Sequence, residues 1–142
     1  MSSAERTLIM IKPDGVQRGF IGDIIKRFER RRFKLIAMKL IEPNEEKMRK
    51  HYMEHASKAW FNDFIKFMTS GPVVPMVWEG SNIVKLARVM LGLTDPLESQ
   101  PKTIRGDYCI QISPSAIHGS DSTENATREI NIWFNRKELI TY

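Results

Sequence analysis

The apolar residues of this chain fall into two kinds of pattern, which alternate along its length. Residues 8–11 form a continuous apolar run that predicts a central strand, and further strands are expected near residues 35–40 and 73–78. Between these stretches, apolar residues recur at every third or fourth position, which is typical of a helix that buries one face. This spacing predicts helices over residues 21–32, from residue 44, and over residues 61–68, 82–91 and 121–134.

The order of these elements predicts the fold class. Strands and helices alternate, and a last short strand is expected at Ala116 and Ile117. This order favours an α+β fold, a ferredoxin-like α/β sandwich in which helices cover a small antiparallel sheet. Pro75 places the third predicted strand near an edge or a bulge, because proline cannot donate a hydrogen bond to a neighbouring strand. With its two prolines, the stretch 92–103 is expected to be a surface loop, and residues 1–142 a single domain.

Composition narrows the setting in which the protein works. The single cysteine, Cys109, excludes an intramolecular disulfide framework and favours a reducing compartment. No apolar run approaches membrane-spanning length, and the first residues lack the apolar core of a signal peptide. We therefore expect a cytoplasmic protein with no membrane partner. The formal net charge of +5 suits polyanionic partners such as nucleotides or nucleic acid, without choosing among them.

His118 is the first candidate for chemistry. It directly follows the apolar pair at the end of the last strand, and helix-starting residues come immediately after it. Asp121 and Glu124 have the spacing of a capping box, and Ser120 and Ser122 are also suitable N-cap residues. An imidazole at the N-terminus of a helix would lie beside free N–H groups and a positive dipole end, which favour an anion such as phosphate.

Glu129 is the second candidate, because it falls on the apolar face of the last predicted helix. Ala126, Ile130 and Trp133 define that face, and a carboxylate among them needs a partner. His118 is the nearest candidate, and a carboxylate on one ring nitrogen would fix the tautomer and leave the other nitrogen to attack or to ligate. Alternatively, His118 packs or caps the helix and Glu129 pairs with a lysine.

Basic residues near the ends of the predicted elements could complete a phosphate site. Lys12, Arg88 and Arg105 would form a phosphate clamp if they gathered around His118. The chain has 22 Lys and Arg residues, so most of them must lie on solvated surface. It contains neither a P-loop nor a glycine fingerprint after a strand, so side chains and helix ends would hold any nucleotide.

Other motifs have simpler explanations. His51, Glu54 and His55 match a short zinc-binding pattern, but no third ligand is evident, and we expect both histidines to face solvent or a groove. The basic run at residues 30–32 could bind nucleic acid or lipid, although cations are common where a helix ends. Trp60 could stack on a base or pack in the core.

Taken together, these segments resemble the nucleoside diphosphate kinase family over nearly the whole chain. The matching blocks occur in the family's order, and the last reads Ile117-His118-Gly119-Ser120-Asp121-Ser122. The other blocks are residues 6–19, His51-Tyr52, residues 70–74, 76–80, 88–92 and 103–107.

The resemblance implies a reaction and assigns residues to it. His118 would take the γ-phosphoryl group of a nucleoside triphosphate and pass it to a diphosphate, in a ping-pong mechanism through a phosphohistidine. Glu129 would orient His118, and Lys12, Tyr52 and Ser120 would complete the catalytic set. Mg²⁺ would be carried on the nucleotide phosphates without a carboxylate cage. The nucleotide contacts would be Lys12, Trp60, Arg88, Thr94, Arg105, Ile112, Ser115 and Gly119, with Trp60 replacing the family's phenylalanine as the base platform.

Several positions depart from the family pattern. Ser115 replaces an asparagine that holds the ribose hydroxyls, and Ser113-Pro114 replaces a Gly-Arg pair beside it, so the contact to the sugar is expected to differ. Lys102 replaces a glycine in the loop between subunits. These departures leave open a second interpretation, a weakly active paralogue that acts mainly as a binding or scaffold protein. A third, a nucleic-acid-binding module, rests on charge alone.

The resemblance also implies assembly. Members of the family are homo-oligomers, and we expect a hexamer built from dimers, with the loop at residues 92–101 at the contact between dimers. Relatives usually continue beyond the position of Tyr142 with a tail that packs on a neighbour. We therefore expect the hexamer of this chain to dissociate more readily on dilution than that of a relative with the tail.

Overall fold

The computed structural model describes residues 4–92 and 116–142. Four of the predicted site residues lie outside the described residues, as do the predicted loop from residue 93 onward and Cys109. These four are Thr94, Arg105, Ile112 and Ser115.

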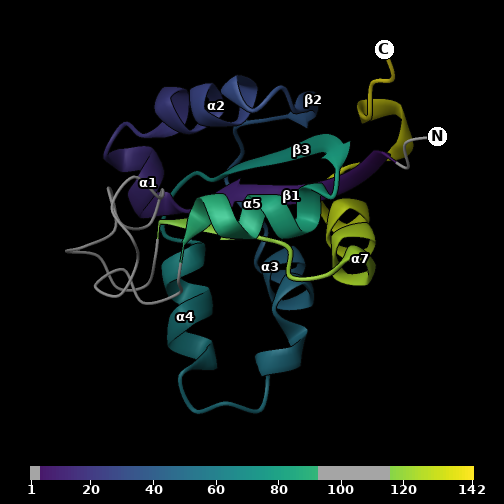
Figure 1. Ribbon diagram of the computed structural model, residues 1–142. Helices are drawn as coiled ribbons and strands as arrows, with labels where there is room; N and C mark the ends of the chain where they lie inside the picture. The colour runs from purple at the N-terminus through teal and green to yellow at the C-terminus, as the bar shows by residue number, and fades with distance from the viewer. Residues whose placement is uncertain (1–3, 93–115) are drawn as a thin grey trace.

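An antiparallel sheet of four strands, in the order β2-β3-β1-β4, organises the described part of the chain (Figure 1). Its strands are β1 (Ala4–Ile11), β2 (Lys34–Met38), β3 (Val74–Ser81) and β4 (Ile117–Gly119). The α-helices are α1 (Pro13–Gln17), α2 (Ile21–Arg30), α3 (Glu45–His51), α4 (Phe61–Met68), α5 (Ile83–Leu91) and α7 (Thr123–Trp133). Short 3-10 helices follow α3 as η1 (Met53–His55) and α7 as η3 (Arg136–Glu138). The predicted α+β, ferredoxin-like class is confirmed.

The two faces of the sheet explain why β1 reads as a continuous apolar run. Leu8 and Met10 pack into a core cluster with residues of α3, α4 and α7, whereas Ile9 and Ile11 pack into a second cluster with residues of α2 and α5. Successive side chains of a strand point to opposite faces, so a strand covered on both sides must be apolar at every position. In Figure 1, α2 lies above the sheet, and α3 and α4 project together below it.

Pro75 led us to expect that its strand lies near an edge of the sheet or at a bulge. The edge position is wrong, because β3 is an inner strand between β1 and β2. Pro75 is its second residue and pairs in register with Met10 of β1. The Pro75 carbonyl accepts a hydrogen bond from the Lys39 N–H at 3.2 Å, just past Met38, where β2 ends. The N–H and C=O of one strand residue point to the same side, so the missing N–H faces the chain just past β2, between the regular strand and the single bridge of Ile41 with Val73.

Local signals at the helix starts are mostly confirmed. Asn44 caps α3 through its side chain, which accepts from the Lys47 N–H at 3.2 Å. At α7 the cap is Ser122, one of the N-cap residues expected from the sequence, and its hydroxyl accepts from the Asn125 N–H at 3.1 Å; Asp121, the other candidate, precedes the cap by one position. Directly after Lys12 the chain forms a short helix, α1, with proline at its first position, where a missing N–H costs no hydrogen bond.

Within the described ranges, every helix is too short or too polar to pass through a lipid bilayer.

Candidate active site

His118 lies in β4, the strand at one edge of the sheet, where it pairs in register with Met10 of β1. Its Nε2 atom is 2.9 Å from Glu129 Oε1, which is hydrogen-bond distance. The His118 side chain is 16% exposed, whereas that of Glu129 is only 5% exposed. The contact expected from the apolar stripe of α7 is therefore present, and the alternative that Glu129 pairs with a lysine is not what the structure shows.

Glu129 projects from α7 into the core, beside the buried residues Ala126, Ile130 and Trp133. The Ser120 hydroxyl donates to the same carboxylate oxygen, Oε1, at 2.7 Å. Burial raises the pKa of Glu129, while the nearby His51 and the Ser120 hydrogen bond act in the opposite direction. Two donors on one oxygen fix the carboxylate in place and direct that oxygen at His118.

His51 is a member of the site that we did not predict. It is the last residue of α3 and is 1% exposed, so the expectation that it faces solvent or a groove is wrong. Its Nε2 atom lies 3.0 Å from His118 Nε2 and 3.8 Å from Glu129 Oε2. The sequence carried a signal for this burial: Met48, three residues earlier, and the adjacent Tyr52 belong to the same buried face of the helix.

A hydrogen bond from Trp133 fixes the tautomer of His51. The Trp133 indole N–H lies 2.8 Å from His51 Nδ1. Because an indole can only donate, Nδ1 must carry the lone pair, and a neutral His51 carries its proton on Nε2. Burial, followed by the neighbouring His118, lowers the pKa of His51 well below the usual value, so His51 is neutral at physiological pH. His51 therefore presents an N–H group on the side of the ring that faces His118 and Glu129.

The contact with Glu129 bears on which ring nitrogen of His118 carries the proton. An ionised Glu129 can only accept, which favours a proton on the His118 nitrogen 2.9 Å from it, Nε2; the N–H of His51, 3.0 Å from the same nitrogen, competes with this proton for the position. In neutral His118 the lone pair available for attack then belongs to Nδ1. A carboxylate that holds one ring nitrogen in this way prepares the other as a nucleophile.

Basic groups lie close to His118. One guanidinium nitrogen of Arg88, from α5, donates to the carbonyl of Gly119 at 3.3 Å. Lys12 follows β1, is 7% exposed, and donates its backbone N–H to the Ala116 carbonyl at 2.8 Å. Lys12 and Arg88 thus approach the strand of His118 from two different elements, as the phosphate clamp requires.

Gly119 is required because the backbone is crowded at this point. A Cβ atom at Gly119 would lie 2.5 Å from Leu91 Cδ1 and 3.3 Å from Ile9 Cδ1. Both side chains are fully buried and cannot easily move aside. The absence of a side chain therefore lets β4 approach β1 and α5.

Aromatic rings extend from His118 toward the surface. The Tyr52 ring lies 5.7 Å from the His118 ring, and the Phe64 ring lies 4.7 Å from the Tyr52 ring, measured between centroids. Trp60 lies at the start of α4, with its ring 5.7 Å from Phe64, and is 47% exposed. Trp60 is therefore a surface aromatic side chain, open to stacking on a flat ligand.

Comparisons with known proteins agree with this geometry. The family model described as nucleoside diphosphate kinase matches residues 5–139. The chain is 56% identical over all of its 142 residues to nucleoside diphosphate kinase B of Bos taurus, of which it covers 93%. It is also 56% identical, over 138 residues, to nucleoside diphosphate kinase of Ginglymostoma cirratum, covering 97% of this chain and 91% of that protein.

The chain belongs to the nucleoside diphosphate kinase family. It is therefore an enzyme of the phosphotransferase class. Solved structures of the family share its fold: the Babesia bovis family member matches with a TM-score of 0.94 at 47% identity, covering 97% of this chain and 93% of that one. The Halobacterium salinarum nucleoside diphosphate kinase in complex with CDP matches with a TM-score of 0.93 at 44% identity, covering 97% and 92% of the two chains.

The residues predicted for a nucleoside diphosphate kinase gather in one region as far as the structure describes them. Those brought together around His118 and along the aromatic series are Lys12, Tyr52, Trp60, Arg88, Gly119, Ser120 and Glu129. Their individual roles in the reaction remain predictions.

The nitrogen and oxygen atoms of His51, His118 and Glu129 lie within 4.8 Å of one another, a spacing at which such groups can hold a metal ion. The hydrogen bond from Trp133 to His51 Nδ1 argues against a metal ion here. It leaves the proton of neutral His51 on Nε2, the nitrogen that would have to bind the metal. Mg²⁺ moreover prefers oxygen ligands in octahedral geometry. These three residues therefore do not fit an Mg²⁺ ion.

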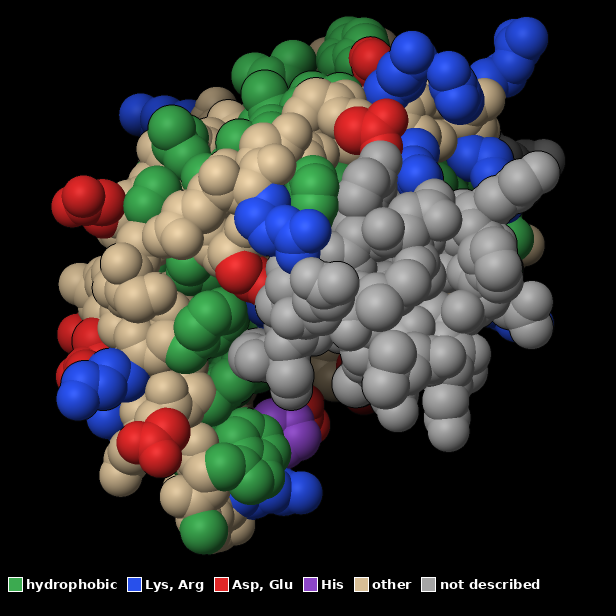
Figure 2. All heavy atoms as spheres, turned by 90° about the vertical axis from the view of Figure 1, so that its left-hand side faces the viewer, with side chains coloured by type: hydrophobic (Ala, Val, Ile, Leu, Met, Phe, Trp, Pro, Cys, Tyr) green, Lys and Arg blue, Asp and Glu red, His purple; other side chains and the backbone are tan. Residues whose placement is uncertain are grey.

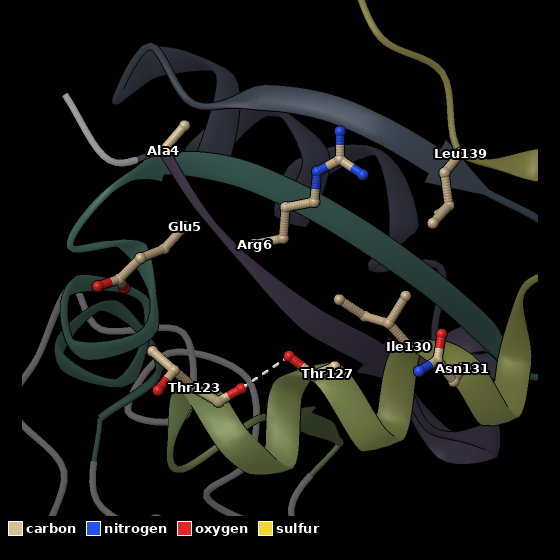
Figure 3. Close-up of a pocket in the computed structure, with 8 residues that line it drawn as sticks. All are labelled: Ala4, Glu5, Arg6, Thr123, Thr127, Ile130, Asn131 and Leu139. Carbon is tan, nitrogen blue, oxygen red and sulfur yellow. Dashed lines mark hydrogen bonds between the residues drawn. The ribbon is translucent and has the colours of Figure 1, made fainter. Parts of the chain in front are cut away.

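A separate hollow of about 390 Å³ lies between the start of β1, α7 and the segment after η3 (Figure 3). Its lining includes Arg6, Thr127 and Leu139, and none of the predicted site residues. Arg6 Nε forms an ion pair with Glu79 Oε1 at 3.0 Å. The hollow is therefore distinct from the His118 region.

Figure 2 shows Lys and Arg side chains at several places on one face, most of them along its upper edge, with acidic side chains among them. The face shown therefore gives no separate support for a nucleic-acid-binding module.

Proposed function

We propose that this chain transfers the γ-phosphoryl group of a nucleoside triphosphate to a nucleoside diphosphate through a phosphohistidine at His118. The observation that carries the proposal is the pair of hydrogen bonds to Glu129 Oε1, from His118 Nε2 at 2.9 Å and from Ser120 at 2.7 Å. These contacts give His118 the tautomer in which Nδ1 can attack phosphorus.

In the proposed binding step, the nucleotide lies along the aromatic series that leads to His118. The base stacks on Trp60, which accepts any base because stacking does not depend on hydrogen-bonding groups. Lys12, Tyr52 and Arg88 face the phosphates. Thr94, Arg105, Ile112 and Ser115, which lie outside the described residues, are proposed as the remaining contacts.

In the proposed chemical step, the lone pair of His118 Nδ1 forms a bond to the γ-phosphorus. The bond from that phosphorus to the bridging oxygen breaks, its electron pair stays on the β-phosphate, and the diphosphate leaves. The imidazole ring gains positive charge as the new bond forms, and the carboxylate of Glu129, 2.9 Å from Nε2, stabilises that charge. A second nucleoside diphosphate then takes the phosphoryl group by the reverse sequence.

Most of the catalytic work in this proposal is electrostatic. The transferred group spreads negative charge over its oxygens, so positioned cations stabilise the transition state. Lys12 and Arg88 supply such cations next to His118. We propose that Mg²⁺ enters as part of the substrate, bound to the nucleotide phosphates, where it neutralises further charge.

We also propose that the protein works as a homo-oligomer, a hexamer by its resemblance to the family, and that it is cytoplasmic. Met38, the last residue of the outermost strand β2, and Leu40, two residues beyond it, are 48% and 63% exposed, which supports a contact with another subunit near this end of the strand.

Steady-state kinetics with two different nucleotides tests the proposed function. A covalent intermediate predicts ping-pong kinetics, with parallel lines in double-reciprocal plots of the rate at several fixed concentrations of the second nucleotide. Intersecting lines, or an unchanged rate in His118→Ala, would contradict it. A weakly active scaffold protein would show binding of nucleotides with little turnover.

A further inference from the structure

Phe64 lies between the two ends of the proposed nucleotide site. It is on α4, one turn after Trp60, and its N–H donates to the Trp60 carbonyl at 3.0 Å. Residues spaced by four lie on the same face of a helix, and the two rings meet at 86° with centroids 5.7 Å apart. Phe64 therefore supports the exposed aromatic side chain proposed as the base platform.

The same ring also contacts the phosphate end of the site. The Phe64 and Tyr52 rings meet at 89°, with centroids 4.7 Å apart, in an edge-to-face arrangement. Tyr52 is 8% exposed and lies next to His118, so its position depends on what packs against it. Phe64 thus has aromatic neighbours in both directions.

Lys12 makes the third contact of this ring. Its ammonium group lies 5.5 Å from the centroid of the Phe64 ring, within cation–π distance. Lys12 is 7% exposed, and a cation–π attraction is stronger where water is excluded. A lysine is a point charge on a flexible stem, so a ring that attracts the ammonium restricts where that charge is found.

We infer that Phe64 is a positioning residue of the phosphotransfer site, which sets Lys12 and Tyr52 in place for the phosphates and Trp60 in place for the base. This inference rests on the proposed function, because it takes these three residues as the nucleotide contacts. Phe64 touches no reacting atom and acts through the side chains around it.

Phe64→Leu tests the inference, since leucine keeps an apolar side chain at this half-buried position and removes the ring. Phe67→Leu is the matched control, because Phe67 is on the same helix and packs against the same core cluster. We expect Phe64→Leu to lower kcat/KM for ATP by about three- to tenfold, the size of one lost cation–π contact, with the control near the wild type. Both variants should have similar melting temperatures.

A double-mutant cycle separates positioning from a general loss of packing. If Phe64 acts through Lys12, Phe64→Leu should cost less in a Lys12→Met background than in the wild type. Equal costs in both backgrounds, or equal losses in the Phe64 and Phe67 variants, would overturn the inference.

Binding of ADP, measured by calorimetry, keeps the inference testable if transfer itself fails. A wild type that binds ADP and forms no phosphohistidine would contradict the proposed function. Phe64 would still be expected to support binding, so Phe64→Leu should weaken ADP affinity by about three- to tenfold relative to Phe67→Leu. Unchanged affinity would overturn its positioning role.

Discussion

Glu129 receives hydrogen bonds from His118 and Ser120 on a single oxygen, and its other oxygen lies 3.8 Å from His51 Nε2. At the scale of single residues, the site depends on this one buried carboxylate. Burial raises its pKa, so the surrounding donors are needed to favour the ionised form.

Replacing Glu129 with glutamine should slow phosphorylation of His118 by about 10- to 100-fold, the usual cost of losing a group that orients a reactive ligand. The amide has no charge to stabilise the imidazolium, and its NH₂ group cannot accept the proton of Nε2. The rate of phosphohistidine formation with excess ATP measures this step directly. Glu124→Gln, at an exposed position of the same helix, is the control and should be unaffected. Equal rates in the Glu129 variant and the wild type would remove Glu129 from the mechanism.

His51 predicts a pH dependence of stability. Folding lowers the pKa of His51 from its ordinary value of 6.5. Below pH 6.5, the unfolded chain therefore takes up a proton on His51 that the folded chain does not bind. The free energy of unfolding should then fall as the pH falls from 6.5 toward the folded pKa, by up to about 1.4 kcal/mol per pH unit from this residue.

His51→Phe should flatten this dependence, because it removes the titrating group while keeping an aromatic ring. Urea unfolding at a series of pH values below 6.5 measures the slope. His55→Phe is the control, since His55 is half-buried on the turn after α3. A slope in His51→Phe as steep as that of the wild type would contradict the assignment of a neutral, buried His51.

At the scale of elements, α7 connects the catalytic strand to the core. Ser122 caps the helix, and Glu129 and Trp133 project from its buried face toward His118 and His51. The start of the helix therefore sets the position of two side chains in the site.

Ser122→Ala should destabilise the protein by about 1 kcal/mol, the typical cost of losing an N-cap hydroxyl. The Asn125 N–H would lose the acceptor that it has at 3.1 Å. Urea unfolding measures the change, and Ser122→Asp, which restores an acceptor, should recover most of it. A stable Ser122→Ala protein would mean that Asp121 takes over as the cap.

The sequence was sufficient to predict most elements, and Glu129 shows why. A carboxylate in an apolar helical stripe has few explanations, so its contact with His118 could be expected from the residue pattern alone. Strand order was harder to predict, as Pro75 illustrates, because the effect of a missing N–H depends on where the neighbouring strand ends. The spacing of Met48, His51 and Tyr52 could have indicated that His51 is buried, but its place in the site could not be predicted, since its partner Trp133 is distant in sequence.

At the scale of the whole molecule, the open question is assembly. The outermost strand β2 leaves Met38 and Leu40 exposed at its end, and the segment after η3 pairs with β2 through the Ile140 N–H and the Ile36 carbonyl. Exposed apolar side chains of this kind favour association with a second copy.

We predict a homo-oligomer, a hexamer at high concentration, that shifts toward smaller species on dilution. Light scattering across a dilution series measures the mass. Leu40→Glu should weaken assembly by placing a charge at the exposed edge, while Glu42→Gln nearby serves as control. A monomer of wild type at every concentration would contradict the prediction.

The central claim is that His118 carries the phosphoryl group, and its most direct test is to isolate the intermediate. The protein is incubated with ATP carrying a labelled γ-phosphate, freed of nucleotide, and then mixed with a nucleoside diphosphate. We predict an acid-labile, alkali-stable phosphohistidine at Nδ1 of His118, which the diphosphate discharges to give labelled triphosphate, and no label in His118→Ala. Label on another residue, or label that the diphosphate does not remove, would contradict the account.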